Sequence, residues 1–166
     1  MRFFVYVMVC LGVVIAQSVG APAPLPLHGL YDLMIPLLVY MAVFRPAGEA
    51  IMVAFAAGLI MDSVSGGAFG LYLLVYLWMT GGIRIAMGFF HGEGVIFIVC
   101  AVLAGVLLEN AFFLGAARVA GVSYAFGTTV AGGLARQLVL AGLTGPFLVF
   151  GLNGISRRLA ARFEQG

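Results

Sequence analysis

The sequence is dominated by six runs of mostly apolar residues, at about 3–20, 30–44, 47–61, 69–87, 95–114 and 130–152. A helix of about 20 such residues crosses the hydrocarbon core of a bilayer. Hydrophobic residues make up 64% of the chain and charged residues 8%, whereas about a quarter of the residues of a soluble domain are charged. We therefore expect an all-α membrane protein with a single six-transmembrane-helix bundle over residues 1–155 and a basic cytoplasmic tail over 156–166.

The first run has one alternative interpretation. Arg2 precedes it, and Ala21-Pro22-Ala23 after it resembles the small-residue cleavage site of a signal peptide. The run is longer than the apolar region of a signal peptide, which is roughly 7 to 15 residues. Cleavage would also leave an odd number of spans, so we expect an uncleaved first helix.

The arginines fall mainly on one side of such a bundle. With the N-terminus inside, that side carries Arg2, Arg45, Arg84 and the basic tail, whereas Arg118 lies in a loop on the opposite side. Short cytoplasmic loops of membrane proteins carry an excess of Arg and Lys. We therefore expect both termini to be cytoplasmic.

A tight hairpin is predicted between Gly58 and Tyr72. An apolar run there ends on Asp62, passes through Ser65 and Gly66, and becomes apolar again. An ionisable side chain near the hydrocarbon boundary is costly and often functional. Asp62 is either a solvated helix end or a recognition element for a partner, and we favour recognition.

Two opposite charges lie inside the last two runs. Glu109 is five residues before the expected outer end of its helix, and Arg136 is six residues after the start of the next. Their depths are therefore roughly 8 and 9 Å at about 1.5 Å per residue. We expect an ion pair between them, with Asn110 and Gln137 nearby. This pair either only locks the two helices together or also takes part in binding.

Small residues four positions apart recur in three of the runs. Such pairs allow helix backbones to approach closely in a membrane, and we expect them to serve packing inside the bundle. The pairs are Ala54 with Gly58, Ala101 with Gly105, and Ala141 with Gly145.

Residues that could carry catalysis or bind a metal are scarce. The only cysteines are Cys10 and Cys100, each within an apolar run, and the only histidines are His28 and His91, on opposite sides of the predicted bundle. An enzyme would need a nucleophile, an acid–base pair or a metal constellation. We expect no catalysis, no cofactor, no metal and no nucleic-acid partner. A small-ligand-binding membrane component and a partner-binding scaffold remain open.

From about Asp32 to Tyr72, the order of features resembles the bacterial rod shape-determining protein family MreD. That family has an Asp-Leu-rich short span closing on Arg-Pro, then Gly-Leu-x-x-Asp-x-x-Ser-Gly, a small turn and Gly-Leu. The usual Pro before the first Asp is replaced here by Tyr31. The matching residues are Asp32-Leu33, Arg45-Pro46, the stretch from Gly58 to Gly66, and Gly70-Leu71.

The resemblance implies a non-catalytic inner-membrane scaffold subunit of the cell-elongation machinery. Its implied partners are MreC, the peptidoglycan synthase RodA, the class B penicillin-binding protein and, indirectly, MreB filaments. The implied bundle is similar to the substrate-binding component of energy-coupling vitamin transporters, which keeps small-ligand binding as the alternative. The candidate partner-binding or structural polar residues are Asp32, Arg45, Asp62, Ser65, Gly66, Gly70, Glu109 and Arg136.

Overall fold

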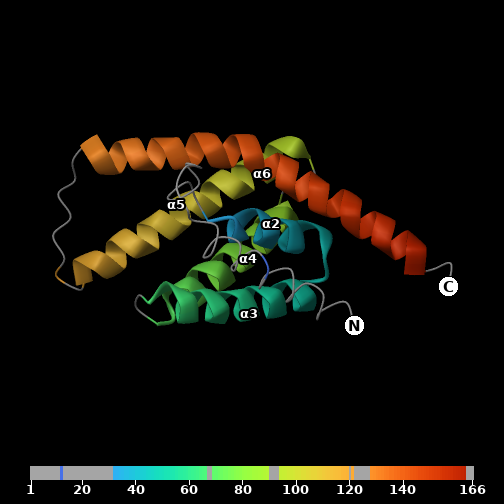
Figure 1. The fold of residues 1–166 in the computed structure, drawn as a ribbon, viewed down its shortest axis with the longest axis horizontal. Coiled ribbons are helices and arrows are strands. Elements are labelled where there is room, and N and C mark those ends of the chain that lie inside the picture. The colour runs from blue at the N-terminus through green and yellow to red at the C-terminus, as the bar shows by residue number, and fades with distance from the viewer. Residues whose placement is uncertain are drawn as a thin grey trace.

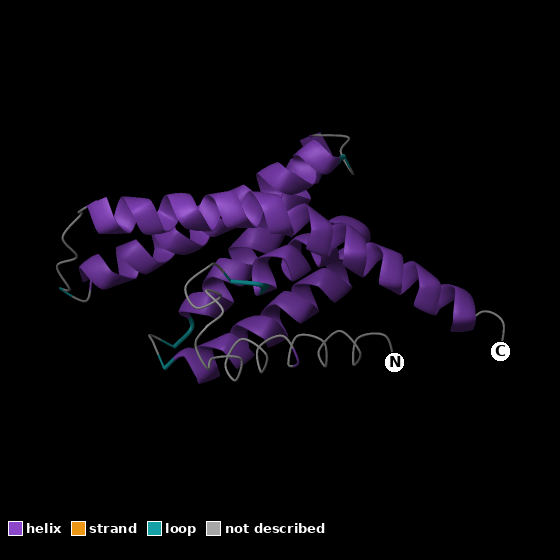
Figure 2. Cartoon of the chain, turned by 45° about the horizontal axis from the view of Figure 1, so that its top comes forward, coloured by secondary structure: helices purple, strands orange, loops and turns teal. Residues whose placement is uncertain are grey.

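The structure, a computed structural model, describes residues 12, 32–66, 69–89, 94–119, 121 and 128–163, with side chains over 132–154 in the last range. Within these ranges every regular element is a helix (Figure 2). The span expected at 3–20 lies outside the described residues, so the total of six spans stays a prediction. The helices are α2 (Met34–Phe44), α3 (Ala47–Ser65), α4 (Leu71–Phe89), α5 (Val95–Val119) and α6 (Thr128–Phe163), as labelled in Figure 1.

Four of these helices are long and apolar enough to cross a membrane. They are α3, α4, α5 and the stretch Gly132–Gly154 of α6. Each coincides with a predicted apolar run, which confirms the expected all-α membrane protein. The backbone stays helical beyond the runs, since α5 ends at Val119 and α6 continues to Phe163, into the expected basic tail.

The short helix α2 differs from the span expected over 30–44. It has 11 residues, about 16 Å at about 1.5 Å per residue, which is roughly half of the ~30 Å hydrocarbon core. Its residues from Met34 to Val43 are all buried, and it contacts each of the four longer helices (Figure 1). A helix that is apolar on every side belongs in a core, so α2 is the central packing element.

Glycines bring the long helices into close contact. A methyl group on Gly58 would lie 2.5 Å from the Cα atom of Leu73 in α4. One on Gly105 would lie 2.7 Å from Met79 Sδ, and one on Gly145 would lie 2.8 Å from Val102 Cγ1. All three glycines belong to the predicted small-residue pairs, and their use in internal packing is confirmed.

The contact at Gly58 predicts a stability loss on substitution. Gly58→Ala should lower the free energy of unfolding in detergent by about 1–3 kcal/mol, the usual cost of overpacking, because the atom it meets is backbone and cannot rotate away. Gly81→Ala in α4 is the matched control, since a methyl group there meets nothing within 4 Å. Equal thermal melting of both variants would contradict the contact.

Candidate functional site

The turn between α3 and α4 depends on two glycines. Gly66 follows the last residue of α3 with φ 64°, and Gly70 precedes α4 with φ 96°. Positive φ is strained for residues with a Cβ atom. Ser65 is the last residue of α3 and is exposed. The predicted tight hairpin is therefore present, with residues 67–68 outside the described part.

Asp62 joins the two helices of this hairpin. Its Oδ1 accepts a hydrogen bond from the Tyr72 backbone N–H at 2.9 Å, and its Oδ2 accepts one from Leu73 N–H at 3.1 Å. These are among the first N–H groups of α4, which have no partner within their own helix. Gly70 has no side chain to cap them, so Asp62 supplies the cap from α3.

The environment of Asp62 corrects one of the two interpretations made from the sequence. Only 4% of the residue is exposed, so it is not a solvated helix end. Both of its carboxylate oxygens are bonded to α4, and its role in recognition of a partner stays a prediction. Gly58 lies one helical turn earlier, where the close approach to Leu73 brings α4 within reach of Asp62.

Asp32 accepts a hydrogen bond at the start of α2, as Asp62 does at the start of α4. Its Oδ1 accepts a hydrogen bond from the Met34 N–H at 2.9 Å, at the start of α2. Its Oδ2 accepts one from the hydroxyl of Tyr76 in α4. A carboxylate is favourable at a helix N-terminus because of the backbone dipole. Asp32 is only partly buried, and it ties the central helix to α4.

The expected ion pair between Glu109 and Arg136 is not formed between these two described side chains. At this level α5 and α6 are in contact through the next residue of each helix. Asn110 Nδ2 donates a hydrogen bond to Gln137 Oε1 at 3.0 Å. Glu109 is half-buried, whereas Arg136 is exposed. Successive helical residues point about 100° apart, which turns both charges away from the line where α5 meets α6.

At the other end of α3, Arg84 binds the backbone that connects α2 to α3. Arg45 follows α2 in an extended conformation, φ −122° and ψ 158°, as expected before a proline. The guanidinium of Arg84 in α4 donates from Nη2 to the backbone carbonyl of Arg45. Basic side chains stabilise the carbonyl ends of helices. Arg45 is therefore held through its backbone by a residue that the sequence analysis did not select.

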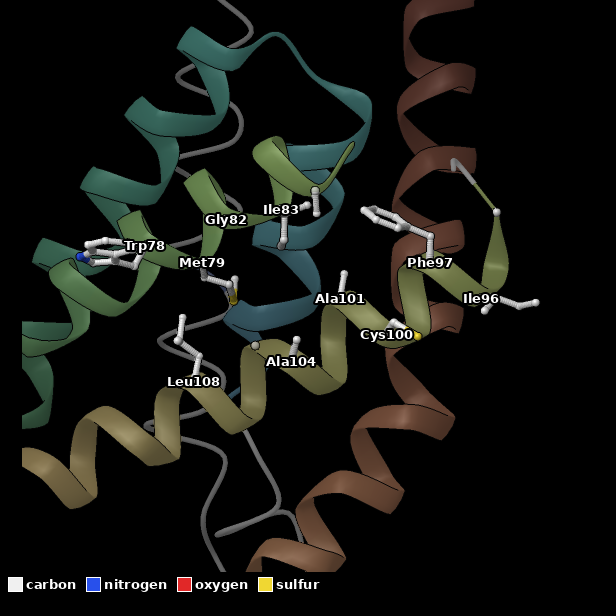
Figure 3. A pocket seen from close by; sticks show the side chains of 13 residues that line it. Trp78, Met79, Gly82, Ile83, Ile96, Phe97, Cys100, Ala101, Ala104 and Leu108 are labelled. Carbon is white, nitrogen blue, oxygen red and sulfur yellow. The ribbon is translucent and has the colours of Figure 1, made fainter. Parts of the chain in front are cut away.

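An apolar groove of about 790 Å³ lies between α4 and α5 (Figure 3). Trp78 and Ile83 of α4 face Phe97 and Ala101 of α5 across it. None of the candidate acids Asp32, Asp62 and Glu109 lines it. Its lining is largely hydrocarbon and glycine, with the indole of Trp78, the thioether of Met79 and the thiol of Cys100, and it suits an apolar ligand better than a hydrophilic one.

A known protein family matches most of this chain. The sequence model of one family, rod shape-determining protein MreD, matches residues 1–141. The chain belongs to the MreD family. It is therefore a rod shape-determining membrane protein, and the resemblance found in the hairpin extends over most of the chain. No curated protein and no solved structure matches it.

Two residues that hold this MreD-family bundle together, Tyr76 and Arg84, were missed as site residues. The spacing of polar residues along α4 could have identified them. Tyr72, Tyr76, Thr80 and Arg84 follow one another at intervals of four residues in an apolar helix. Side chains four apart lie on one face of a helix, and polar groups in a membrane helix face protein rather than lipid.

Removing the cap at Asp62 should destabilise the hairpin. Asp62→Ala leaves two N–H groups of α4 without their acceptor, and each unpaired buried group costs about 1–3 kcal/mol. Asp62→Asn keeps one acceptor oxygen and should lose less. The measurement is thermal unfolding in detergent, with Ser63→Ala as control because the Ser63 hydroxyl bonds only within α3, to the Leu59 carbonyl. Identical melting of Asp62→Ala and Ser63→Ala would refute the cap.

The bond between Tyr76 and Asp32 should appear in a double-mutant cycle. Tyr76→Phe and Asp32→Asn each weaken it, and the double variant should lose less stability than the sum of the two. Coupling energies of contacting residues are about 0.5–3 kcal/mol. Tyr72→Phe with Asp32→Asn is the comparison cycle and should couple more weakly. Additive losses in the Tyr76 cycle would exclude the bond.

Proposed function

We propose that the protein is a non-catalytic scaffold subunit of the rod complex in the bacterial cytoplasmic membrane. It binds MreC and supports peptidoglycan synthesis by RodA and the class B penicillin-binding protein, with MreB filaments as indirect partners. The observation that carries this proposal is the match of residues 1–141 to the MreD family.

The chemistry of the described residues supports a scaffold. Asp62, Asp32 and Arg84 bond to backbone groups or to another side chain of this chain. Groups engaged in this way are not free to act on a substrate. The exposed side chains of the long helices are largely apolar, among them Trp78, Ile85 and Phe147. Such surfaces in a bilayer meet lipid or the transmembrane helix of a partner.

The candidate polar residues then act on partners indirectly. Asp32, Asp62 and the two glycines of the turn fix the positions of α2, α3 and α4, and Arg45 is fixed by Arg84. We infer that these residues set the geometry of the apolar surface, while that surface makes the contacts. Both termini lie in the cytoplasm in this proposal, because the arginines concentrate on that side.

Co-purification tests this proposal. The tagged full-length chain, co-expressed with MreC and extracted in detergent, should retain MreC. The amount of MreC per folded chain should be unchanged in Asp62→Asn, because Asp62 bonds to α4 and not to a partner. Absence of MreC, or retention of an ATPase module or a small molecule in its place, would favour the ligand-binding alternative.

A further inference from the structure

The side of α6 that faces away from the bundle carries a charge. Ala141 and Val149 are fully buried against the bundle, and Gly145 between them packs on Val102. Arg136 precedes Gly145 by nine residues, which at about 100° per residue places it about 180° around the helix. Its side chain is exposed. Arg136 is therefore on the side of α6 opposite to Gly145, away from the helices that α6 packs against.

The surface around this charge is apolar over the length of the span. Val139 is 67% exposed, Leu143 69% and Phe147 81%. We call this surface the Arg136 face, and it consists of Gly132, Arg136, Val139, Leu143, Phe147 and Gly154. In a membrane-spanning helix it meets either lipid chains or another helix.

The charge of Arg136 lies in an apolar surrounding. Arg136 lies within the candidate span Gly132–Gly154 of α6. An arginine within a membrane helix usually pairs with an acid or faces the protein interior. Among the described residues it makes no hydrogen bond or ion pair. The described bundle therefore does not supply its countercharge, and an acid on another helix would.

Glycines on the same face indicate a close neighbour. A methyl group on Gly132 or Gly154 would meet nothing within 4 Å, in contrast to Gly58, Gly105 and Gly145, which are in tight internal contacts. No contact among the described residues occupies the space beside these two. Small residues on one face allow close approach of a second helix. A lipid phosphate would also balance Arg136, and adducts with lipid alone are one outcome of the test below.

We propose that the Arg136 face docks a transmembrane helix of another protein, which presents an Asp or Glu side chain at the depth of Arg136. Charge complementarity selects the partner helix, and the apolar residues and glycines pack against it. This proposal deepens the scaffold function proposed above and rests on it.

Site-specific cross-linking in cells tests the docking surface. A photoreactive amino acid replaces Leu143 in the full-length chain, and the adduct is mapped by mass spectrometry. The control places the same group at Met52 on α3, which is 59% exposed on a different helix. We expect the Leu143 position to capture a membrane-spanning peptide that contains an acidic residue, and the Met52 position not to capture that peptide.

Changes at Arg136 then test the charge. Arg136→Gln should lower the yield of the adduct about tenfold, because it leaves the acid of the partner helix without its countercharge. Arg136→Lys should retain most of it. Arg136→Glu should abolish the adduct, and replacement of the partner's acid by Arg should restore it. Thermal melting of each variant checks that the chain still folds, and Asp/Glu→Ala in the partner tests the same pair with this chain unchanged.

Three results would overturn the proposal: adducts with lipid alone, adducts with a second copy of this chain, or an adduct whose yield does not depend on Arg136. The outcome is separable from the proposed partnership with MreC. If the captured acidic helix belongs to a protein other than MreC, the docking surface stands and that partnership fails. If MreC co-purifies but is captured only at other positions, the partnership with MreC stands and the proposed docking surface fails.

Discussion

The carboxylate of Asp62 at the start of α4 is the contact on which the hairpin, and with it the bundle, depends. A helix that begins inside a membrane protein exposes N–H groups that water cannot reach, and each must find an acceptor. Gly70 turns the chain at positive φ and its carbonyl accepts from the Leu74 N–H, but it has no side chain to accept from Tyr72 and Leu73. Asp62 provides two acceptor oxygens, and the absence of a side chain at Gly58 allows α4 to come near enough to use them.

The same principle explains where the other charges lie. Asp32 holds the first turn of α2, and Arg84 holds the backbone carbonyl that follows its last turn. Acids at helix starts and arginines at helix ends both oppose the backbone dipole. The short central helix is thus fixed at both ends by side chains, and two of its supports, Tyr76 and Arg84, come from one face of α4.

The sequence predicted the long spans, the hairpin and the glycine contacts because each depends on a local pattern. It could not show that α2 is too short to span, since an apolar run of that length suits a buried core helix as well as a membrane helix. It placed Glu109 and Arg136 near the correct level, where Asn110 meets Gln137. Depth follows from counting residues, but the direction of a side chain around its helix depends on packing that no single run contains.

The bond between Asp62 and α4 also bears on biosynthesis. On its own, α3 would enter the bilayer with an acidic side chain near its end and no donor for it, and an acid within a span disfavours insertion by up to about 3 kcal/mol. Once α4 lies beside it, the same carboxylate is saturated by N–H groups that would otherwise be unpaired. The two helices therefore gain by entering the bilayer side by side, with the carboxylate and the N–H groups already paired.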